Sequence, residues 1–407
     1  MAQTFAYQAR NLTGKLLTGK IEAENHLAAV VLLREKNIFV TKINPVKKLD
    51  FTSMLGLKVK IKEMAIFCRQ FATMYEAGIS LLQCLNIFLQ QTESKNLRKI
   101  LQEVTVEIEK GKSLSEAFRK FKDRLPELFI NTLTAGEISG TIDQALGRLA
   151  VHFEKEHALK EKIKSAMIYP LLVAGIAFLA MVVLLVLVVP IFVEIFTQAG
   201  ATLPAPTRIL IAVSSFLTKY WYIVLLALIV LFFALRQAIA TENGKRIIDQ
   251  LLLKLPVVGP LTHKTGLSRF ARTLATLLRS GVPLMQSLET LEKVVGNTIV
   301  VKEISKAREN IREGGKMAPM FMKSKIFPLL AVNMIAIGEE SGSLDDLLEK
   351  LAIFYEQEVE ALVTRLSSTI EPFLIAGVGL MVGFIALSIY LPLFSLAGAL
   401  QGGMVTP

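Results

Sequence analysis

The 407-residue chain has only two cysteines, Cys68 and Cys84, and a single tryptophan. Two cysteines give no disulfide framework, and their spacing of 16 residues fits no common zinc-binding pattern. We therefore interpret both as small buried hydrophobic residues. No long apolar run lies near the first residue, so we expect no cleavable signal peptide.

Residues that support catalysis are also scarce. There are four histidines, and His152 and His157 are five residues apart, which does not match the i, i+4 spacing of a helical zinc pair. The nearest nucleotide-binding pattern is residues 14–20, but Ile21 follows where a magnesium-binding hydroxyl is needed, and a strand rather than a helix is predicted there. We expect no catalytic residue, no cofactor and no metal site.

Charged residues are absent from three long stretches of the chain. The composition is 52% hydrophobic and 20% charged, with a mean hydropathy of +0.50, which is too apolar for an ordinary soluble protein. A membrane-spanning helix needs about 20 mostly apolar residues. The sequence predicts three such spans, at 169–196, 219–240 and 370–396.

Two local sequence features predict how the spans bend and pack. Pro190 is expected to kink the first span. Gly379 and Gly383 form a small-residue face on the third span, which serves either tight packing within the chain or pairing between two chains.

Basic residues indicate the orientation in the membrane. Of the 46 lysines and arginines, 44 lie in residues 1–164 and 236–365. Lys164, Arg236 and Arg365 flank the spans on one side, whereas the 197–218 loop and the C-terminal tail offer only Arg208 on the other. By the positive-inside rule, the N-terminus and both large segments are cytoplasmic and the C-terminus is external.

The overall charge of +11 has a second implication. The basic residues are spread through predicted helices and are not clustered with aromatic residues. This pattern favours anionic lipid or acidic protein surfaces as partners and argues against nucleic acid.

The chain contains an internal repeat. Residues 135–146 read AGEISGTIDQAL and residues 337–348 read IGEESGSLDDLL; extending the comparison to 135–156 and 337–358 gives ten identities in 22 positions. Chance would give roughly one or two. Gly78 and Gly281 correspond with an offset of 203, and Pro170 and Pro372 with an offset of 202. We infer that a helical domain and its following span are duplicated.

The repeated segments predict a corner between two helices. Gly140 and Gly342 are expected to take the left-handed conformation that ends a helix. A capping box is expected to start the next helix, and an acidic residue to favour its positive end. The predicted box pairs are Thr141 with Gln144 and Ser343 with Asp346, and the acidic residues are Asp143 and Asp345.

Glu137 and Glu339 need a different explanation. A carboxylate in the last turn of a helix opposes the helix dipole, which suggests a specific partner such as arginine or lysine. An internal salt bridge and a contact with a partner protein both remain open, and a catalytic role has little support. The possible structural or partner-contact positions are Glu137, Gly140, Asp143, Glu339, Gly342 and Asp345.

The expected fold is an all-α integral membrane protein with two homologous cytoplasmic helical-bundle domains, three transmembrane helices and a small N-terminal α+β module. The expected order is module 1–45, linker 46–61, first domain 62–168, span 169–196, external loop 197–218, span 219–240, second domain 241–369, span 370–396 and external tail 397–407.

Several of these motifs together resemble one family, the inner-membrane platform proteins of type IV pilus assembly and type II secretion. They are CRQFATMYEAGISLLQCL (68–85), its counterpart SRFARTLATLLRSGVPLMQSL (268–288), the two GE-SG corners, the prolines before the spans, and the N-terminal FAYQARNLTGKLLTGKIEA. The second copy departs from the first at Arg269–Phe270 and at Glu340, so the two domains are expected to face different partners.

The resemblance implies a non-catalytic protein of the bacterial inner membrane. Its implied partners are a hexameric cytoplasmic ATPase, pilin or pseudopilin subunits, other inner-membrane assembly proteins, membrane lipid and further copies of the chain. The alternative is a subunit of a transporter or channel, which would need polar residues inside the spans. A membrane-bound enzyme is a third possibility and would need a convergent polar site.

Overall fold

The computed structural model describes residues 3–11, 16–23, 28, 31–32, 38–45, 58–191, 194, 205–256, 258–324 and 326–402. The chain divides into two units, residues 1–58 and 59–407, which are described separately. Strands occur in the first unit, and the regular structure described in the second unit is helical. This confirms the predicted fold class.

The N-terminal unit contains a three-stranded antiparallel sheet. Its strands are β1 (Gln3–Asn11), β2 (Leu16–Ala23) and β3 (Ile38–Pro45), in the order β2-β1-β3. Gly19 and Lys20 lie inside β2, opposite Tyr7 and Ala6 of β1. Because a strand continues through Lys20, the segment lacks the helix that a phosphate-binding loop needs. The helix expected in the α+β module, near residues 24–36, lies mostly outside the described residues.

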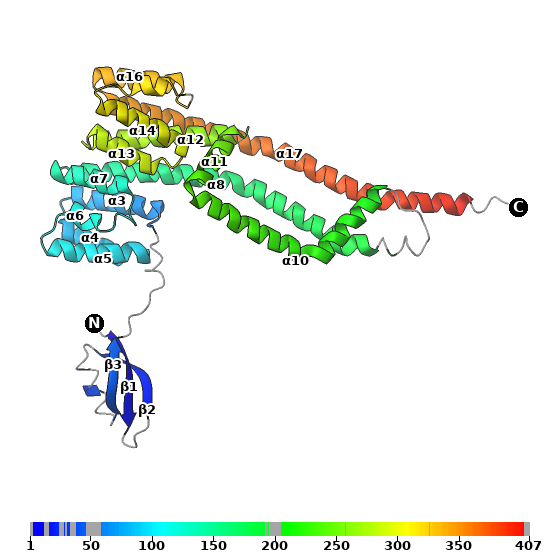
Figure 1. The fold of residues 1–407 in the computed structure, drawn as a ribbon, viewed down its shortest axis with the longest axis horizontal. Helices are drawn as coiled ribbons and strands as arrows, with labels where there is room; N and C mark the ends of the chain where they lie inside the picture. The colour runs from blue at the N-terminus through cyan, green and yellow to red at the C-terminus, as the bar shows by residue number, and fades with distance from the viewer. Residues whose placement is uncertain are drawn as a thin grey trace. The chain divides into compact units, whose positions relative to one another are not determined.

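The second unit contains two domains of six helices in the same order (Figure 1). The first domain comprises α3 (Ile61–Glu76), α4 (Leu81–Gln91), α5 (Lys95–Glu109), α6 (Leu114–Arg119), α7 (Glu127–Ile138) and α8 (Ile142–Val183). The second comprises α12 (Val258–Arg279), α13 (Leu284–Val294), α14 (Thr298–Arg312), α15 (Ala318–Met322), α16 (Leu329–Ser341) and α17 (Leu344–Gly402). Each helix of the first domain therefore has a counterpart in the second.

Aromatic side chains fill equivalent places in the two cores. Phe67 and Phe118 lie 5.9 Å apart between ring centroids, and their counterparts Phe270 and Phe321 lie 5.5 Å apart. Further rings pack on these pairs from different positions. They are Phe71, Phe88 and Phe129 in the first domain, and Phe327, just before α16, in the second. The cores share an architecture but are packed with different side chains.

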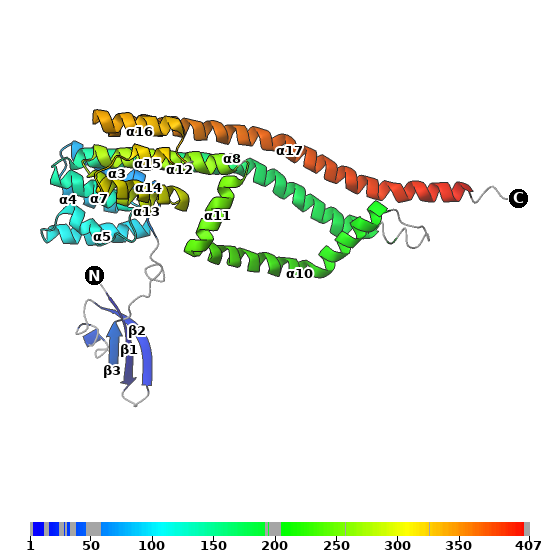
Figure 2. The ribbon, with the colours of Figure 1, turned by 45° about the horizontal axis from the view of Figure 1, so that its top comes forward.

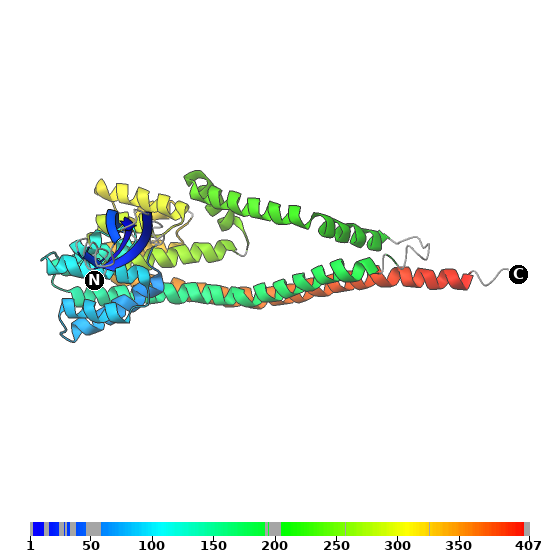
Figure 3. The same cartoon turned by 90° about the horizontal axis from the view of Figure 1, so that it is seen from below.

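The last helix of each domain continues without interruption into a predicted span. We call α8 and α17 the exit helices; they lie side by side and run in the same direction (Figures 1 and 3). Pro170 lies inside α8, so the proline expected to open a span interrupts no helix. The boundaries drawn from sequence at 168/169 and 369/370 thus fall within continuous helices.

In the described part of the chain, three helices are long and apolar enough to cross a membrane: Ile142–Ile191, Thr218–Gln237 and Leu344–Ser388. The first has a π-helical turn, η1 (Leu184–Val188), which ends two residues before Pro190. A π-helical turn leaves backbone carbonyls without their usual partners. Ser214 donates a hydrogen bond of 2.5 Å to the carbonyl of Leu185 in this turn.

Part of the segment expected to be an external loop is helical. Helix α10 spans Ala205–Ala240, with a non-helical backbone at Tyr220, and α11 (Glu242–Lys254) follows it (Figure 2). Residues 205–218 form a helix because they are largely apolar: Leu210 is buried against Leu185 and Ile385. Gly379 and Gly383 of the third span make no such close contact within the chain, since no atom lies within 4 Å of a β-carbon built on either glycine.

The domain corners require a close helix approach that can be tested with alanine substitutions. A β-carbon added to Gly136 would lie 2.4 Å from the β-carbon of Ala145, whereas one added to Gly147 would meet nothing within 4 Å. Gly136→Ala should therefore lower the free energy of unfolding by about 1–3 kcal/mol. Gly147→Ala should raise it by about 0.5–1 kcal/mol, because alanine favours the helix.

Chemical denaturation of the purified protein in detergent measures both changes. Equal effects of the two substitutions would contradict the proposed close approach.

Candidate functional site

The repeated segments form the same corner in both domains. Gly140 has a φ angle of +71° and Gly342 of +70°, the left-handed conformation in which glycine is least strained. Helix α7 or α16 ends there, and an exit helix begins within four residues. Asp143 and Asp345 lie in the first turns of the exit helices, where a negative charge is favourable.

The predicted capping box does not form at Thr141. No backbone N–H donates to its side chain; instead its hydroxyl lies 2.7 Å from the hydroxyl of Ser139. Gln144, the other half of the predicted box, accepts a hydrogen bond from Arg148. In the second domain Ser341 and Ser343 make the same hydroxyl pair at 2.6 Å, and Asp346 pairs with Arg279. The repeated hydroxyls therefore stabilise the turn and not the helix N-terminus.

Glu137 and Glu339 accept backbone hydrogen bonds from the start of a short helix. The two oxygens of Glu137 accept from the N–H groups of Leu114 and Ser115 at 2.7 and 3.0 Å. Those of Glu339 accept from Met317 and Ala318 at 2.6 and 3.0 Å. The expected partner was a cation, but the observed partner is the N-terminus of α6 or α15, whose N–H groups lack helical acceptors.

The hydrogen bonds also set the charge of Glu137. Burial disfavours its carboxylate, but hydrogen bonds from Ser115 and from the backbone N–H groups outweigh burial and lower its pKa. A lowered folded-state pKa stabilises the protein above the unfolded-state pKa, and this contribution is lost as pH falls through the folded value. Glu137 is thus an ionised helix cap at neutral pH.

Replacing either carboxylate by an amide tests this assignment. Glu137→Gln and Glu339→Gln should each lower the free energy of unfolding by about 1–3 kcal/mol, because a glutamine amide group cannot accept the second backbone N–H. Glu340→Gln is the matched control: Glu340 is exposed and pairs only with the exposed Lys316 among the described residues, so the change should stay within about 0.5 kcal/mol.

Thermal or denaturant unfolding in detergent measures all three variants. If Glu340→Gln cost as much as Glu339→Gln, the helix-capping role would be wrong.

A second repeated interaction joins the first and last helices of each domain. The guanidinium of Arg69 forms a bidentate ion pair with the carboxylate of Glu154, with N···O distances of 2.7 and 2.6 Å. Arg272 does the same with Glu356, at 2.8 and 2.9 Å. Arg69 and Arg272 are 203 residues apart, the offset of the neighbouring glycines. The departure expected at Arg269–Phe270 was therefore a misalignment, since the arginine is present in both copies.

The two domains contact each other through different parts of their surfaces. Helices α7 and α8 of the first domain meet α12 and α13 of the second. Leu277 and Val282, on either side of the α12–α13 turn, are buried in the core of the first domain. The sequence does not predict this contact, because its pattern marks these residues as apolar without showing which domain covers them.

Polar contacts surround this apolar centre. Asn131 donates to the hydroxyl of Thr290 at 2.7 Å, and Lys293 pairs with Glu127 at 2.8 Å. The guanidinium of Arg148 donates to the backbone carbonyl of Arg279. These pairs fix the position of the α12–α13 turn on α7 and α8.

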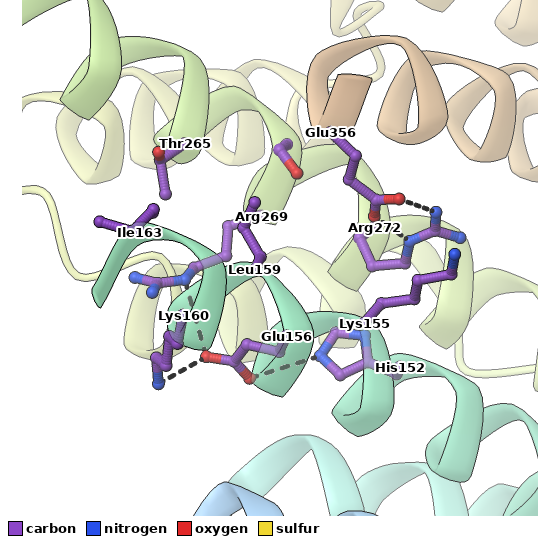
Figure 4. Close-up of a pocket in the computed structure, with 11 residues that line it drawn as sticks. His152, Lys155, Glu156, Leu159, Lys160, Ile163, Thr265, Arg269, Arg272 and Glu356 are labelled. Carbon is purple, nitrogen blue, oxygen red and sulfur yellow. Dashed lines mark hydrogen bonds and ion pairs between the residues drawn. The ribbon is translucent and has the colours of Figure 1, made fainter. Parts of the chain in front are cut away.

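A partly buried cluster of ionisable side chains lies farther along the same interface (Figure 4). Glu156 of α8 is 3.0 Å from Lys160, 3.7 Å from Arg269 and 4.0 Å from His152. Arg272 completes the cluster and also pairs with Glu349. Glu156 of the first domain therefore lies between Lys160 of its own helix and Arg269 of the second domain, and its attraction to Arg269 stabilises the interface.

His152 is the buried member of the cluster. Its ring lies 3.2 Å from the hydroxyl of Thr276 across the interface. Burial lowers its pKa to about 4; Glu156 opposes this shift, and Arg272 and Arg269 add to it. His152 is therefore neutral at neutral pH.

The lowered pKa of His152 predicts a pH-dependent stability. Below its ordinary pKa of 6.5 the unfolded chain binds a proton that the folded chain does not, so stability falls as pH drops from 6.5 towards 4. The contribution is at most about 1.4 kcal/mol per pH unit. His152→Phe, which introduces the residue of the second repeat, should remove that part of the dependence.

Unfolding of the two proteins, measured at intervals between pH 7 and about 4.5, gives the comparison. Parallel stability curves for wild type and His152→Phe would contradict the assignment.

Among the described residues, no three His, Cys, Asp or Glu side chains are arranged to hold a metal ion. Cys68 and Cys84 are buried, and burial raises the pKa of both thiols. The corner residues fix helix ends, and the interface residues hold the two domains together. The six positions singled out from sequence lie at the two corners, one set in each domain, and are not brought together.

Comparison with known proteins gives consistent matches along the chain. The family model described as type II secretion system (T2SS), protein F, matches residues 67–190 and 270–392, and the model of its N-terminal domain matches residues 1–44. The two matched segments correspond to the two repeats with their exit helices.

Individual relatives cover nearly the whole chain. The chain is 41% identical to a type IV pilus assembly protein, PilC, of Thermus thermophilus, over 98% of this chain and 99% of that protein. It is 35% identical to a PilC protein of Myxococcus xanthus, over 98% and 96%. It is also 32% identical to a type II secretion system protein F of Pseudomonas aeruginosa, over 96% and 98%.

Proposed function

The chain belongs to the type II secretion system protein F family, which includes pilus assembly proteins, and from this premise we propose that it is a non-catalytic platform of the bacterial inner membrane. In this proposal the platform couples a cytoplasmic assembly ATPase to the insertion of pilin or pseudopilin subunits into a growing filament. The machine is a type IV pilus or a type II secretion system.

The observation that carries the proposal is the continuity of the exit helices. Each cytoplasmic domain buries the first part of an exit helix in its own core: Leu149 and Phe153 in α8, and Leu351 and Tyr355 in α17. The same helix then continues as a membrane span. A force applied to a domain is therefore transmitted to the bilayer along a helix and not through a flexible linker.

The partners and the orientation belong to the same proposal. The cytoplasmic domains would contact the ATPase, and the spans would contact pilin or pseudopilin subunits, other inner-membrane assembly proteins and lipid, with several copies of the chain acting together. The N-terminus and both domains would be cytoplasmic and the C-terminus external, as the distribution of lysine and arginine favours.

The transporter alternative has less support. Intramembrane polar groups of a transport path would face a cavity or one another. Two buried hydroxyls within or beside the described spans, those of Thr207 and Ser214, instead donate to backbone carbonyls of Ser388 and Leu185. Such bonds satisfy helix backbone and serve packing.

Breaking the continuity of one exit helix tests the proposal. Insertion of Gly-Gly-Ser-Gly after Arg365, between the domain and the span of α17, should abolish filament or pseudopilus assembly while the protein still accumulates in the membrane. The matched control is the same insertion after Thr241, where α10 already ends, and it should retain most assembly activity.

Filament yield and membrane content are measured together in cells that lack the native copy. Normal assembly with the helix interrupted, or in cells without the protein at all, would contradict the proposed role.

A further inference from the structure

The contact between the two domains is head-to-tail. The first domain contributes a docking face on α7 and α8, which includes Glu127, Asn131, Arg148 and His152. The second contributes a docking corner on α12 and α13. In a two-fold symmetric contact, each domain would contribute both surfaces. In a head-to-tail contact each domain contributes only one, so the docking face of the second domain and the docking corner of the first remain unused.

The unused docking face lies on α16 and α17 of the second domain. The counterparts of Glu127, Asn131, Arg148 and His152 are Leu329, Asn333, Lys350 and Phe354. His152 is only 3% exposed because the second domain covers it, whereas Phe354 is 40% exposed and Leu329 is 67% exposed. This face is more apolar than the one already covered, and an exposed apolar patch indicates a docking surface.

The unused docking corner lies at the α3–α4 turn of the first domain. Leu277 and Val282 correspond to Met74 and Ile79, which are half-buried. Arg279, whose carbonyl meets Arg148, corresponds to Glu76, which is exposed. If the same contact formed between two copies, Glu76 would lie opposite Lys350 of the unused face. These opposite charges attract, whereas the contact within the chain brings Arg279 and Arg148 together.

The other charges near the unused face already have partners. Asp346 pairs with Arg279 and Glu340 with Lys316 within the second domain. No ion pair of Lys350 or Glu76 is recorded among the described residues. The pair is thus an opposite-charge contact that the two unused surfaces can add.

The orientation of the exit helices is compatible with repetition of the contact between chains. Helices α8 and α17 run in the same direction along each other (Figure 3), and Lys162 of α8 pairs with Glu360 of α17 at 2.6 Å. The rotation that relates the two domains therefore has its axis roughly parallel to these helices. Applying it again keeps the next pair of spans in the same membrane.

We propose that the α3–α4 corner of one copy of this chain docks on the α16–α17 face of a second copy, repeating the contact between the two domains within each chain. A head-to-tail contact that returns to its starting point forms a closed ring of domains. The smallest such ring contains two copies of the chain. The exit helices then surround the ring axis.

Cysteine cross-linking between copies tests the contact. One copy carries Glu76→Cys and one tag, and a second copy carries Lys350→Cys and another tag; a short bis-maleimide is added to membranes that contain both. We expect a covalent product that bears both tags. The native thiols of Cys68 and Cys84 are buried and should give little background.

In the matched control, Val106→Cys takes the place of Glu76→Cys. Val106 lies on α5, outside the α3–α4 turn, and is 46% exposed. A mixed-tag product that forms equally with the control would overturn the proposal. So would copies that co-purify without the Glu76–Lys350 product, since they would associate through another surface. The proposal would also be overturned if a different protein covered the face around Phe354 and no product bearing both tags formed.

Exchange of the two charges gives a second, independent measurement. Glu76→Lys and Lys350→Glu should each reduce co-purification of differently tagged copies several-fold, because each places like charges together. The double variant restores opposite charges and should recover co-purification. Lys302→Glu, an exposed change on α14, should have no effect; a double variant no better than the single ones would contradict the pairing.

Discussion

The rest of the structure depends on one constraint, the satisfaction of backbone hydrogen bonds in a continuous helix. Lipid offers no partners to N–H and C=O groups, so a chain that enters a bilayer must do so as a helix or a closed barrel. Here the helix that enters the bilayer is also the last core helix of a folded domain, and this happens twice. Each domain and its span are therefore joined by one continuous helix. The duplicated corners set the point at which each exit helix begins.

The corners show how few interactions define that starting point. A left-handed glycine ends α7 or α16, a pair of hydroxyls holds the turn, and Glu137 or Glu339 ties the corner to the start of a short helix. Each part satisfies backbone groups that would otherwise be unpaired. Because the three parts act together at both corners, folding gives a physical reason for the repeated sequence.

Much of the architecture could be predicted from the sequence, because its signals are local or repeated. Spans follow from apolar length, and the left-handed Gly140 follows from its place between two helices. The partner of Glu137 could not be predicted, because it lies 22 and 23 residues earlier in the chain and is backbone, which carries no sequence signal. The residue that covers His152 could not be predicted either, since Thr276 lies 124 residues away. Residues 205–218 were assigned to a loop because their apolar run is short.

The central claim is that one rigid helix joins each domain to its span. The distance between two spin labels on α8 tests it. Val151 lies in the domain and Gly175 in the span, and both are exposed. With labelled chains diluted into unlabelled chains in lipid, pulsed electron resonance should give one narrow distribution near 36 Å, from about 1.5 Å per residue over 24 residues. A broad or markedly shorter distribution would show that the helix bends or breaks at Pro170, and would contradict the account.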